Sequence, residues 1–148
     1  MSEENLEIVR RLTDAMQAGL ERYDLGADLD MEAITVEFDS AGVAADLELI
    51  PAREVPGPRS YRGLAGLIEF MRTWTEDFEA WSNEYDRFIG APDDRVVALA
   101  HQTGTGKGSG VPVELHYGLV FELKERRVIR IRLFLDPAEA LEAAGLSQ

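Results

Sequence analysis

The stretch VIRIRLFLDPAEALEAAGL, residues 128–146, changes its periodicity halfway along, and this change shapes the end of the fold. Its first half alternates with a period of two, which predicts a β-strand. Asp136-Pro137 then ends the strand, and a helix rich in Ala, Leu and Glu follows. One face of the strand is aliphatic, and the other carries Arg130, Arg132, Phe134 and Asp136. If that second face is covered, its charges beside an aromatic ring would form a binding site.

The composition predicts one acidic globular domain over residues 1–148. Of these residues, 45% are hydrophobic and 29% are charged, and the net charge is −13. Nucleic acids and anionic membranes need clustered Lys and Arg, so we expect neither as a partner. The sequence holds no cysteine, which excludes disulfides and thiolate chemistry. It begins with the polar run MSEENLEIVRR and has no apolar run near the roughly 20 residues that span a bilayer, so we expect a soluble, cytoplasmic protein.

Periodicity predicts helices followed by a run of strands. The helices are expected at 3–24, 30–39 and 64–81, with a short one after Pro137. The strands are expected at 46–50, 84–90, 95–104, 111–124 and 128–136. Residues 51–60 hold three prolines and a glycine, which predicts a loop. The helix at 64–81 has the heaviest apolar stripe, so it needs a sheet to pack against, and the order as a whole predicts the α+β class.

Two turns predict the register of the last three strands. A glycine-rich loop of four residues places Gly106 opposite Val111, and a two-residue turn places Lys124 opposite Arg127. One predicted face then carries Ala98, Ala100, Gln102, Leu115, Tyr117, Leu119, Phe121, Arg132, Phe134 and Asp136. The other face carries Val97, Leu99, His101, His116, Val120, Ile129, Ile131, Leu133 and Leu135. A slip of one residue in either turn would exchange a whole set of side chains.

Both predicted faces are apolar, whereas an antiparallel sheet with one wet face should show polar residues there. The helices can cover one face, and a second copy of the chain is the simplest cover for the other, which predicts a homodimer through the outer sheet face. The face that mixes aromatic, small and polar side chains has the make-up of a small-molecule pocket. We therefore predict that a hydrophobic small molecule contacts Arg132, Tyr117, Phe134, Trp74 and Gln102. The alternatives are that Arg132 reaches solvent at a sheet edge and that Trp74 and Tyr117 are core residues.

Three segments, YRGLAGLIEFMRTW, HQTGTGKGSGVPVE and VIRIRLFLDPAEALEAAGL, resemble the SnoaL-like, polyketide cyclase-like branch of the nuclear transport factor 2-like superfamily. The resemblance implies a cone-shaped fold in which a curved antiparallel sheet wraps around N-terminal helices. The superfamily includes ketosteroid isomerases, polyketide cyclases and proteins with no known activity, so the fold alone does not select a function. Ketosteroid isomerases keep a catalytic Asp at the end of the first strand, where this chain has Leu49.

The candidate catalytic residues are Asp136, His101 and His116. Asp136 could abstract a proton next to a carbonyl, but it also starts a helix-capping pattern with Pro137 and Glu139. The predicted register places the two histidines opposite each other, either as an acid/base pair or as an interface pair. A metal ion would need a third ligand, and only Glu114 stands near on the same face, so we expect no metal and no cofactor.

These residues predict a small-molecule pocket protein and leave open whether it is an enzyme. One hypothesis is a cofactor-independent cyclase or isomerase that acts on a hydrophobic carbonyl compound by general acid/base chemistry. In that case Arg132 and Tyr117 would bind the oxyanion. The alternative is a non-catalytic small-molecule binding protein, or a dimeric scaffold of the same fold. Leu49 in place of the isomerase Asp favours the alternative.

Overall fold

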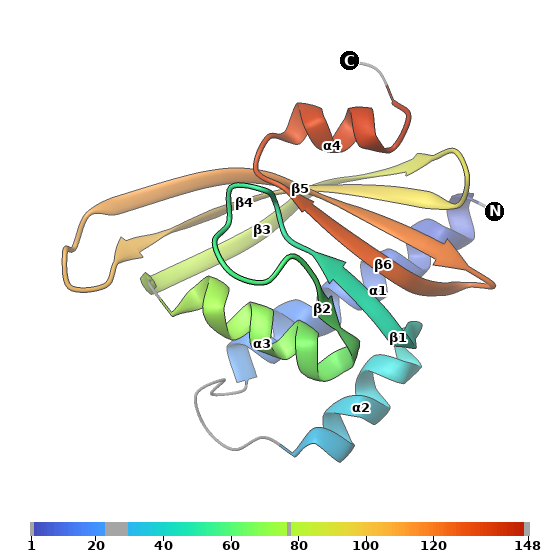
Figure 1. The fold of residues 1–148 in the computed structure, drawn as a ribbon, viewed down its shortest axis with the longest axis horizontal. Helices are drawn as coiled ribbons and strands as arrows, with labels where there is room; N and C mark the ends of the chain where they lie inside the picture. Colours follow the sequence, from blue (N-terminus) through green and yellow to red (C-terminus); the bar gives the residue numbers. More distant parts are fainter. Residues whose placement is uncertain (1, 23–29, 77, 147–148) are drawn as a thin grey trace.

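Within the described residues, six strands form one curved sheet with helices on both of its sides (Figure 1). The computed structural model describes residues 2–22, 30–76 and 78–146. The helices are α1 (Ser2–Arg22), α2 (Met31–Ser40), α3 (Gly63–Thr75) and α4 (Pro137–Ala143). The strands are β1 (Val43–Ile50), β2 (Tyr61–Arg62), β3 (Phe78–Ala91), β4 (Arg95–Gly106), β5 (Pro112–Lys124) and β6 (Arg127–Phe134). The predicted α+β class is confirmed.

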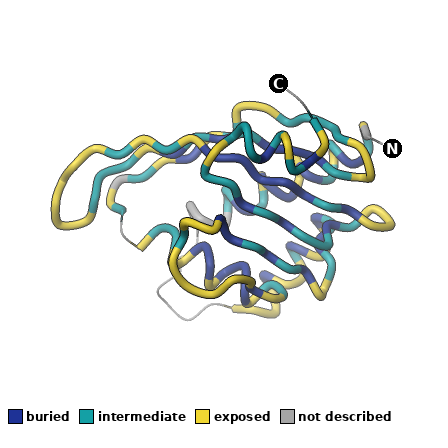
Figure 2. The backbone as a smooth tube through the Cα atoms, turned by 45° about the horizontal axis from the view of Figure 1, so that its top comes forward, coloured by how far each residue is buried: buried dark blue, intermediate teal, exposed yellow. Residues whose placement is uncertain are grey.

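The sheet has the strand order β2-β1-β6-β5-β4-β3. Every neighbouring pair is antiparallel except β1 and β6, which run parallel, so the last strand lies between the first strand and β5. Helices α1, α2 and α3 lie on the inner side of the sheet, and α4 lies on the outer side. Buried residues follow the middle of the sheet, whereas the tip of the β4–β5 hairpin is exposed (Figure 2). None of the described helices is long and apolar enough to span a bilayer.

The main error in the predicted elements lies between α3 and β3. The sequence predicts one helix over 64–81, but α3 ends at Thr75 and β3 already begins at Phe78. Phe78 and Trp81 continue the helical stripe, yet Trp81 also starts an alternating pattern with Asn83 and Tyr85, and the strand uses that second period. The two-residue strand β2 was not predicted, because it is too short to show a period.

The predicted register of β4 and β5 is confirmed. His101 pairs with His116, and Ala100 pairs with Tyr117. At the tip of this hairpin, the backbone N–H of Gly106 donates to the carbonyl of Val111 at 2.9 Å. The turn between β5 and β6 also has its predicted two residues, which both adopt the left-handed conformation that suits a tight hairpin: Glu125 at φ 51° and Arg126 at φ 66°.

The predicted register of β6 is wrong beyond its first residues, because β6 contains a bulge. Leu123 pairs with Val128, but the next pair joins Glu122 to Arg130, so Ile129 is an extra residue without a partner. A bulge adds one residue to one strand, and a shift of one residue sends every later side chain to the opposite face. The predicted faces of Ile131, Leu133, Arg132 and Phe134 are therefore exchanged.

Helix α4 covers part of the outer face of the sheet, through which the sequence predicts a homodimer. Ala140 of α4 and its C-cap residue Ala144 pack on Val97 and Val120, and all four side chains are buried. Their close approach depends on Gly118 in β5, since a Cβ atom there would lie 2.5 Å from the Cβ of Ala140. A glycine at this position lets the helix rest directly on the strand.

Replacing Gly118 with Ala should therefore lower the free energy of unfolding by about 1–3 kcal/mol, because the added methyl group overpacks the contact with α4. Urea unfolding measures this loss. In the double variant Gly118→Ala/Ala140→Gly the clash is removed, so its loss should be smaller than the sum of the two single losses. Simple additivity would show that α4 does not rest on Gly118.

Candidate functional site

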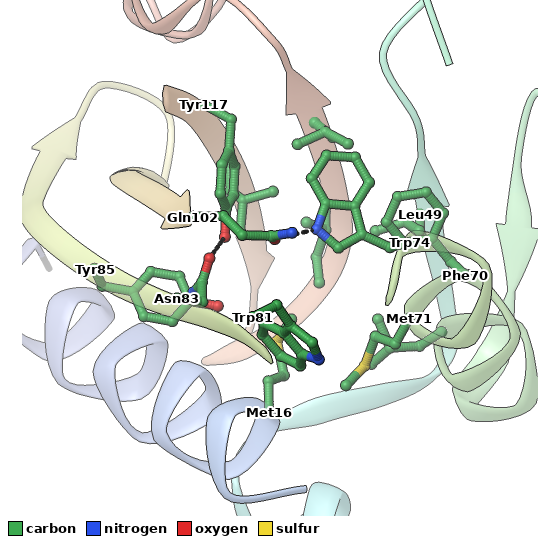
Figure 3. A pocket seen from close by; sticks show the side chains of 14 residues that line it. Met16, Leu49, Phe70, Met71, Trp74, Trp81, Asn83, Tyr85, Gln102 and Tyr117 are labelled. Atoms are coloured by element: carbon green, nitrogen blue, oxygen red, sulfur yellow. Dashed lines mark hydrogen bonds between the residues drawn. The ribbon is translucent and has the colours of Figure 1, made fainter. Parts of the chain in front are cut away.

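An internal pocket lies between the inner face of the sheet and helices α1 and α3 (Figure 3). The space within and at the mouth of the pocket is about 540 Å³, a figure that includes open solvent. The helices supply Met16, Leu67, Phe70, Met71 and Trp74, and the strands supply Leu49, Trp81, Asn83, Tyr85, Gln102, Tyr117, Leu119, Ile131 and Leu133. The inner face of a curved sheet is concave, so these side chains converge on one space.

The described lining of this pocket is aromatic, aliphatic and uncharged. It includes no Asp, Glu, His, Lys or Arg, and its polar side chains are two amides, two phenols and the indole N–H groups. A buried charge on a ligand would find no opposite charge here, and its desolvation would be costly. The pocket therefore suits an uncharged ligand that is mostly apolar and carries a few hydrogen-bonding atoms.

One polar pair on the pocket wall joins α3 to β4. The indole Nε1–H of Trp74 donates to Oε1 of Gln102 at 2.6 Å, and Gln102 is only 3% exposed. Trp74 also packs edge-on against Tyr117, with ring centroids 5.8 Å apart. This hydrogen bond uses the amide oxygen of Gln102, which fixes the orientation of the side chain beside the pocket.

A second polar group on the wall consists of Tyr117, Asn83 and Tyr85. The Tyr117 hydroxyl donates to Oδ1 of Asn83 at 2.5 Å. The two tyrosine hydroxyls also interact with each other. Removal from water raises the pKa of Tyr85 to about 12 and raises that of Tyr117 well above its ordinary value. Both phenols are therefore protonated at neutral pH, where they can donate hydrogen bonds but cannot act as bases.

Three of the predicted ligand-binding residues line this pocket. Tyr117 and Gln102 face inward because the β4–β5 register is as predicted, and Trp74 faces inward from α3. Leu49, which stands where the resemblance would place the isomerase Asp, also lines the pocket. Its neighbour Glu48 points to the other side, where it accepts a hydrogen bond from Nε of Arg130 at 3.1 Å.

Arg132 and Phe134 do not line the pocket, so the prediction that they do is wrong. The bulge at Ile129 turns both to the outer side of β6, where the Arg132 guanidinium lies 5.0 Å from the centre of the Phe134 ring. Both residues line a separate, open cleft on the outer face beside residues 51–54, where the space, open solvent included, is about 680 Å³. The two side chains are together, as predicted, but on the opposite face of the sheet.

The three predicted catalytic residues also lie outside the pocket. Asp136 is the N-cap of α4, where its carboxylate accepts the backbone N–H of Ala138 at 3.0 Å, so the helix-capping alternative describes its position. His101 and His116 lie on the outer face of the sheet, opposite each other. The central pocket therefore brings together none of the predicted acid/base groups.

The sequence reasoning missed most of the apolar wall and two polar residues. Ile131 and Leu133 were assigned to the wrong face because of the bulge. Asn83 lies one residue before the expected strand 84–90, and Tyr85 was missed because no register was predicted for that strand. The pattern Trp81-x-Asn83-x-Tyr85 was the available signal, since alternation from Trp81 places all three on one face.

Solved structures similar to this chain share its fold at low sequence identity. A proposed SnoaL-like polyketide cyclase from Jannaschia sp. CCS1 has a TM-score of 0.65 and 21% identity, over 99% of this chain and 95% of that one. An NTF2-like protein from Burkholderia thailandensis E264 has a TM-score of 0.66 and 18% identity, over 93% and 96%. TerC, co-crystallised with polyporic acid, has a TM-score of 0.64 and 19% identity, over 95% and 97%. No protein-family model matches the sequence, and no curated protein is similar to it.

The chain has the nuclear transport factor 2-like fold, as these matches show. The predicted resemblance to the SnoaL-like branch is confirmed at the level of the fold, including the curved sheet around N-terminal helices. The TM-scores establish a common fold, whereas identities near 20% are too low to transfer an activity.

The two raised tyrosine pKa values predict how stability changes in alkali. Below pH 10 the hydroxyls are protonated in both the folded and the unfolded chain. Between pH 10 and about 12, the unfolded chain releases these protons while the folded chain keeps them. The free energy of unfolding should therefore fall by about 1.4 kcal/mol per pH unit for each such tyrosine.

Urea unfolding at a series of pH values up to 11.5 measures this slope. In the variant Tyr85→Phe/Tyr117→Phe the two proton-binding groups are removed, so stability should fall less steeply over the same range. Equal slopes in the two proteins would show that the tyrosines titrate normally.

Proposed function

We propose that the protein binds an uncharged, largely hydrophobic small molecule that carries a carbonyl or hydroxyl oxygen, and that it needs no cofactor to do so. The observation that carries this proposal is the pocket lining, which combines aromatic and aliphatic walls with two amides and two phenols. Neutral polar groups in an apolar wall orient a ligand without demanding a charge on it.

Specificity would come from the polar groups on one wall. Gln102 accepts from Trp74 through its oxygen, so its amide N–H groups are the donors that can face a ligand. The Tyr85 and Tyr117 hydroxyls can donate to a ligand oxygen in exchange for their present partners. A ligand that lacks oxygen would leave these groups unpaired when it displaces water, which costs free energy.

The fold comparison supports binding in general terms. TerC, which shares the fold, was co-crystallised with polyporic acid. This observation concerns TerC, and it agrees with a pocket of this shape holding a small organic molecule. The chemical class of ligand that we propose for the present chain follows from its own lining, which is uncharged.

A cyclase or isomerase activity is the second candidate, and the tyrosine pair is the observation that favours it. Two protonated phenols on one wall could hydrogen-bond the oxyanion that forms when a proton leaves the carbon next to a carbonyl. The described lining contains no carboxylate or imidazole to take that proton. This is why binding without chemistry is the first candidate.

Ligand-induced changes in melting temperature test the binding proposal. With a library of neutral hydrophobic carbonyl compounds, a ligand at 100 times its dissociation constant should add about 2.7 kcal/mol to the stability of the wild-type protein. Trp81→Ala removes part of the pocket wall and should reduce this gain. Arg132→Ala is the matched control, since it changes the outer face and should leave the gain unchanged.

Each result has a distinct meaning for the pocket. If Arg132→Ala alone loses the ligand-induced stabilisation, the ligand binds in the outer cleft, and the proposal is contradicted. An equal gain in all three proteins would mean that the ligand binds elsewhere. For any compound that binds in the pocket, a product assay with Tyr117→Phe as the control then separates binding from turnover.

A homodimer through the outer sheet face remains a prediction, but the reasons for it are weaker than the sequence suggested. Ile131 and Leu133 point into the pocket, and α4 covers Val97 and Val120. Sedimentation velocity over a range of protein concentrations tests the dimer. We expect a species of twice 16.5 kDa, and a constant mass of 16.5 kDa at every concentration would contradict it.

A further inference from the structure

A row of three potential metal ligands crosses the outer face of the sheet, away from the pocket. Glu84 of β3 pairs with His101 of β4, and His101 pairs with His116 of β5. Neighbouring strands lie about 4.8 Å apart, so the side chains of such a row reach one another when they share a face. The two imidazole rings lie with their centroids 5.6 Å apart.

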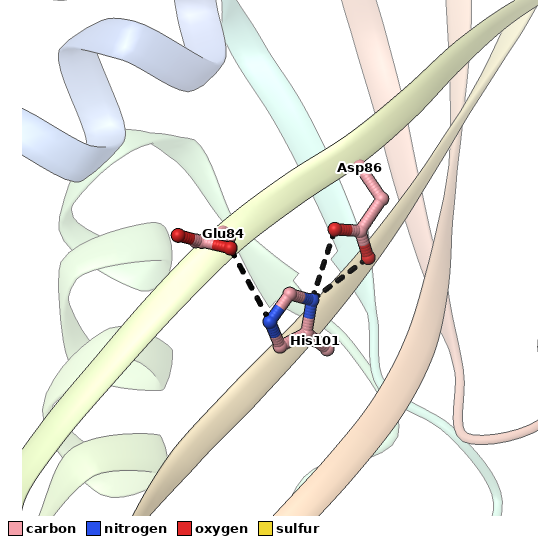
Figure 4. Close-up of side chains that lie close together, drawn as sticks. All are labelled: Glu84, Asp86 and His101. Carbon is pink, nitrogen blue, oxygen red and sulfur yellow. Dashed lines mark hydrogen bonds and ion pairs between the residues drawn. The ribbon is translucent and has the colours of Figure 1, made fainter.

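A bulge in β3 adds a second carboxylate to this row. Tyr85 pairs with Ala100 and Arg87 pairs with Leu99, so Asp86 is the extra residue between them. Both carboxylate oxygens of Asp86 lie 2.9 Å from Nδ1 of His101, as Figure 4 shows. Because a bulge redirects a side chain, Glu84 and Asp86 of the same strand can both contact one imidazole.

The two nitrogens of His101 have different surroundings. The Asp86 carboxylate can only accept a proton from Nδ1, so in the neutral ring Nε2 is the nitrogen with a lone pair. Metal-binding histidines in proteins commonly donate their other ring N–H to a carboxylate in this way, which fixes the ring and makes it a better ligand. Nε2 of His101 is therefore the ring nitrogen that can act as a metal ligand.

The distance between the next two atoms fits a shared metal ion. Nε2 of His101 lies 3.4 Å from Oε2 of Glu84, which is long for a hydrogen bond. Two ligand atoms bound to one tetrahedral zinc ion at about 2.0–2.1 Å lie roughly 3.3–3.5 Å apart. The carboxylate and the imidazole are thus already spaced as two neighbouring ligands.

His116 is placed to supply the third ligand. Its side chain is 61% exposed and faces His101 across the strand pair, so rotation of the ring can bring a nitrogen to the same ion. Glu114 lies beside it, with Oε2 4.0 Å from Nε2 of His116. With Glu84, Asp86 and Glu114, three carboxylates surround two imidazoles, and this negative charge attracts a cation.

We propose that Glu84, His101 and His116 bind a divalent transition-metal ion such as Zn²⁺, with Asp86 as the positioning residue behind His101. Imidazole ligands favour zinc, nickel, cobalt and copper over magnesium and calcium. The ion would join β3, β4 and β5 on the outer face, at a site independent of the pocket and of the proposed function. From the sequence we expected no metal, because the two turns predicted a register for the last three strands only. Glu84 lies in an earlier strand and could therefore not be placed beside the histidines.

Calorimetric titration of the tag-free protein with Zn²⁺ tests the proposal. We expect one ion per chain with micromolar affinity, and no comparable binding of Mg²⁺ or Ca²⁺. Glu84→Gln, His101→Ala and His116→Ala should each weaken binding by about tenfold or more, as should Asp86→Ala. Glu79→Gln is the matched control, because it removes an exposed carboxylate from the same strand without touching the row.

Nitrogen NMR of the histidine rings gives a second readout, which is simple because the chain has only 2 histidines. Zn²⁺ should shift Nε2 of His101 while Nδ1 stays protonated, and Asp86→Ala should abolish this preference for one nitrogen. Binding that weakens equally in Glu79→Gln would indicate diffuse attraction to an acidic surface and overturn the proposal. The absence of Zn²⁺ binding, or unchanged histidine nitrogens at saturation, would overturn it as well.

Discussion

The extra residue in β6 is the constraint on which the pocket depends. Because Ile129 has no partner in β5, Ile131 and Leu133 turn inward and Arg132 and Phe134 turn outward. A regular strand would place a guanidinium in the pocket and aliphatic side chains on the outer face. The uncharged lining therefore results from one inserted residue as much as from the choice of side chains around the pocket.

The bulge in β3 has the complementary effect on the outer face. It brings Asp86 to His101 beside Glu84, while Asn83 and Tyr85 keep their places on the pocket wall. The two bulges together give the faces of the sheet different chemistry: amides and protonated phenols lie inside, and carboxylates and imidazoles lie outside. A small-molecule site and a cation site can therefore share three strands without sharing a side chain.

Local sequence signals predicted the parts of the fold that depend on turns. The glycine loop and the Glu125-Arg126 turn each fix their first pairs, which is why Tyr117 and Gln102 were correctly placed in the pocket. A bulge has no such signal, since it follows from packing on both faces of the finished sheet. The end of α3 was misplaced for a related reason: Trp81 fits the helical period with Phe78 and the strand period with Asn83, and only the pairing of this segment with β4 decides between the two.

The parallel pairing of β1 with β6 has a consequence for the order of assembly. Val43 pairs with Val128, so the first strand finds its main partner only when the last strand exists. During synthesis β1 must wait with an unpaired edge while β3, β4 and β5 can already form their hairpins. Contacts between such distant parts of the chain make closure of the sheet a late and slow step. The inner cavity can thus close only after β6 has been made, although α1 and β1 are the first of its walls to be made.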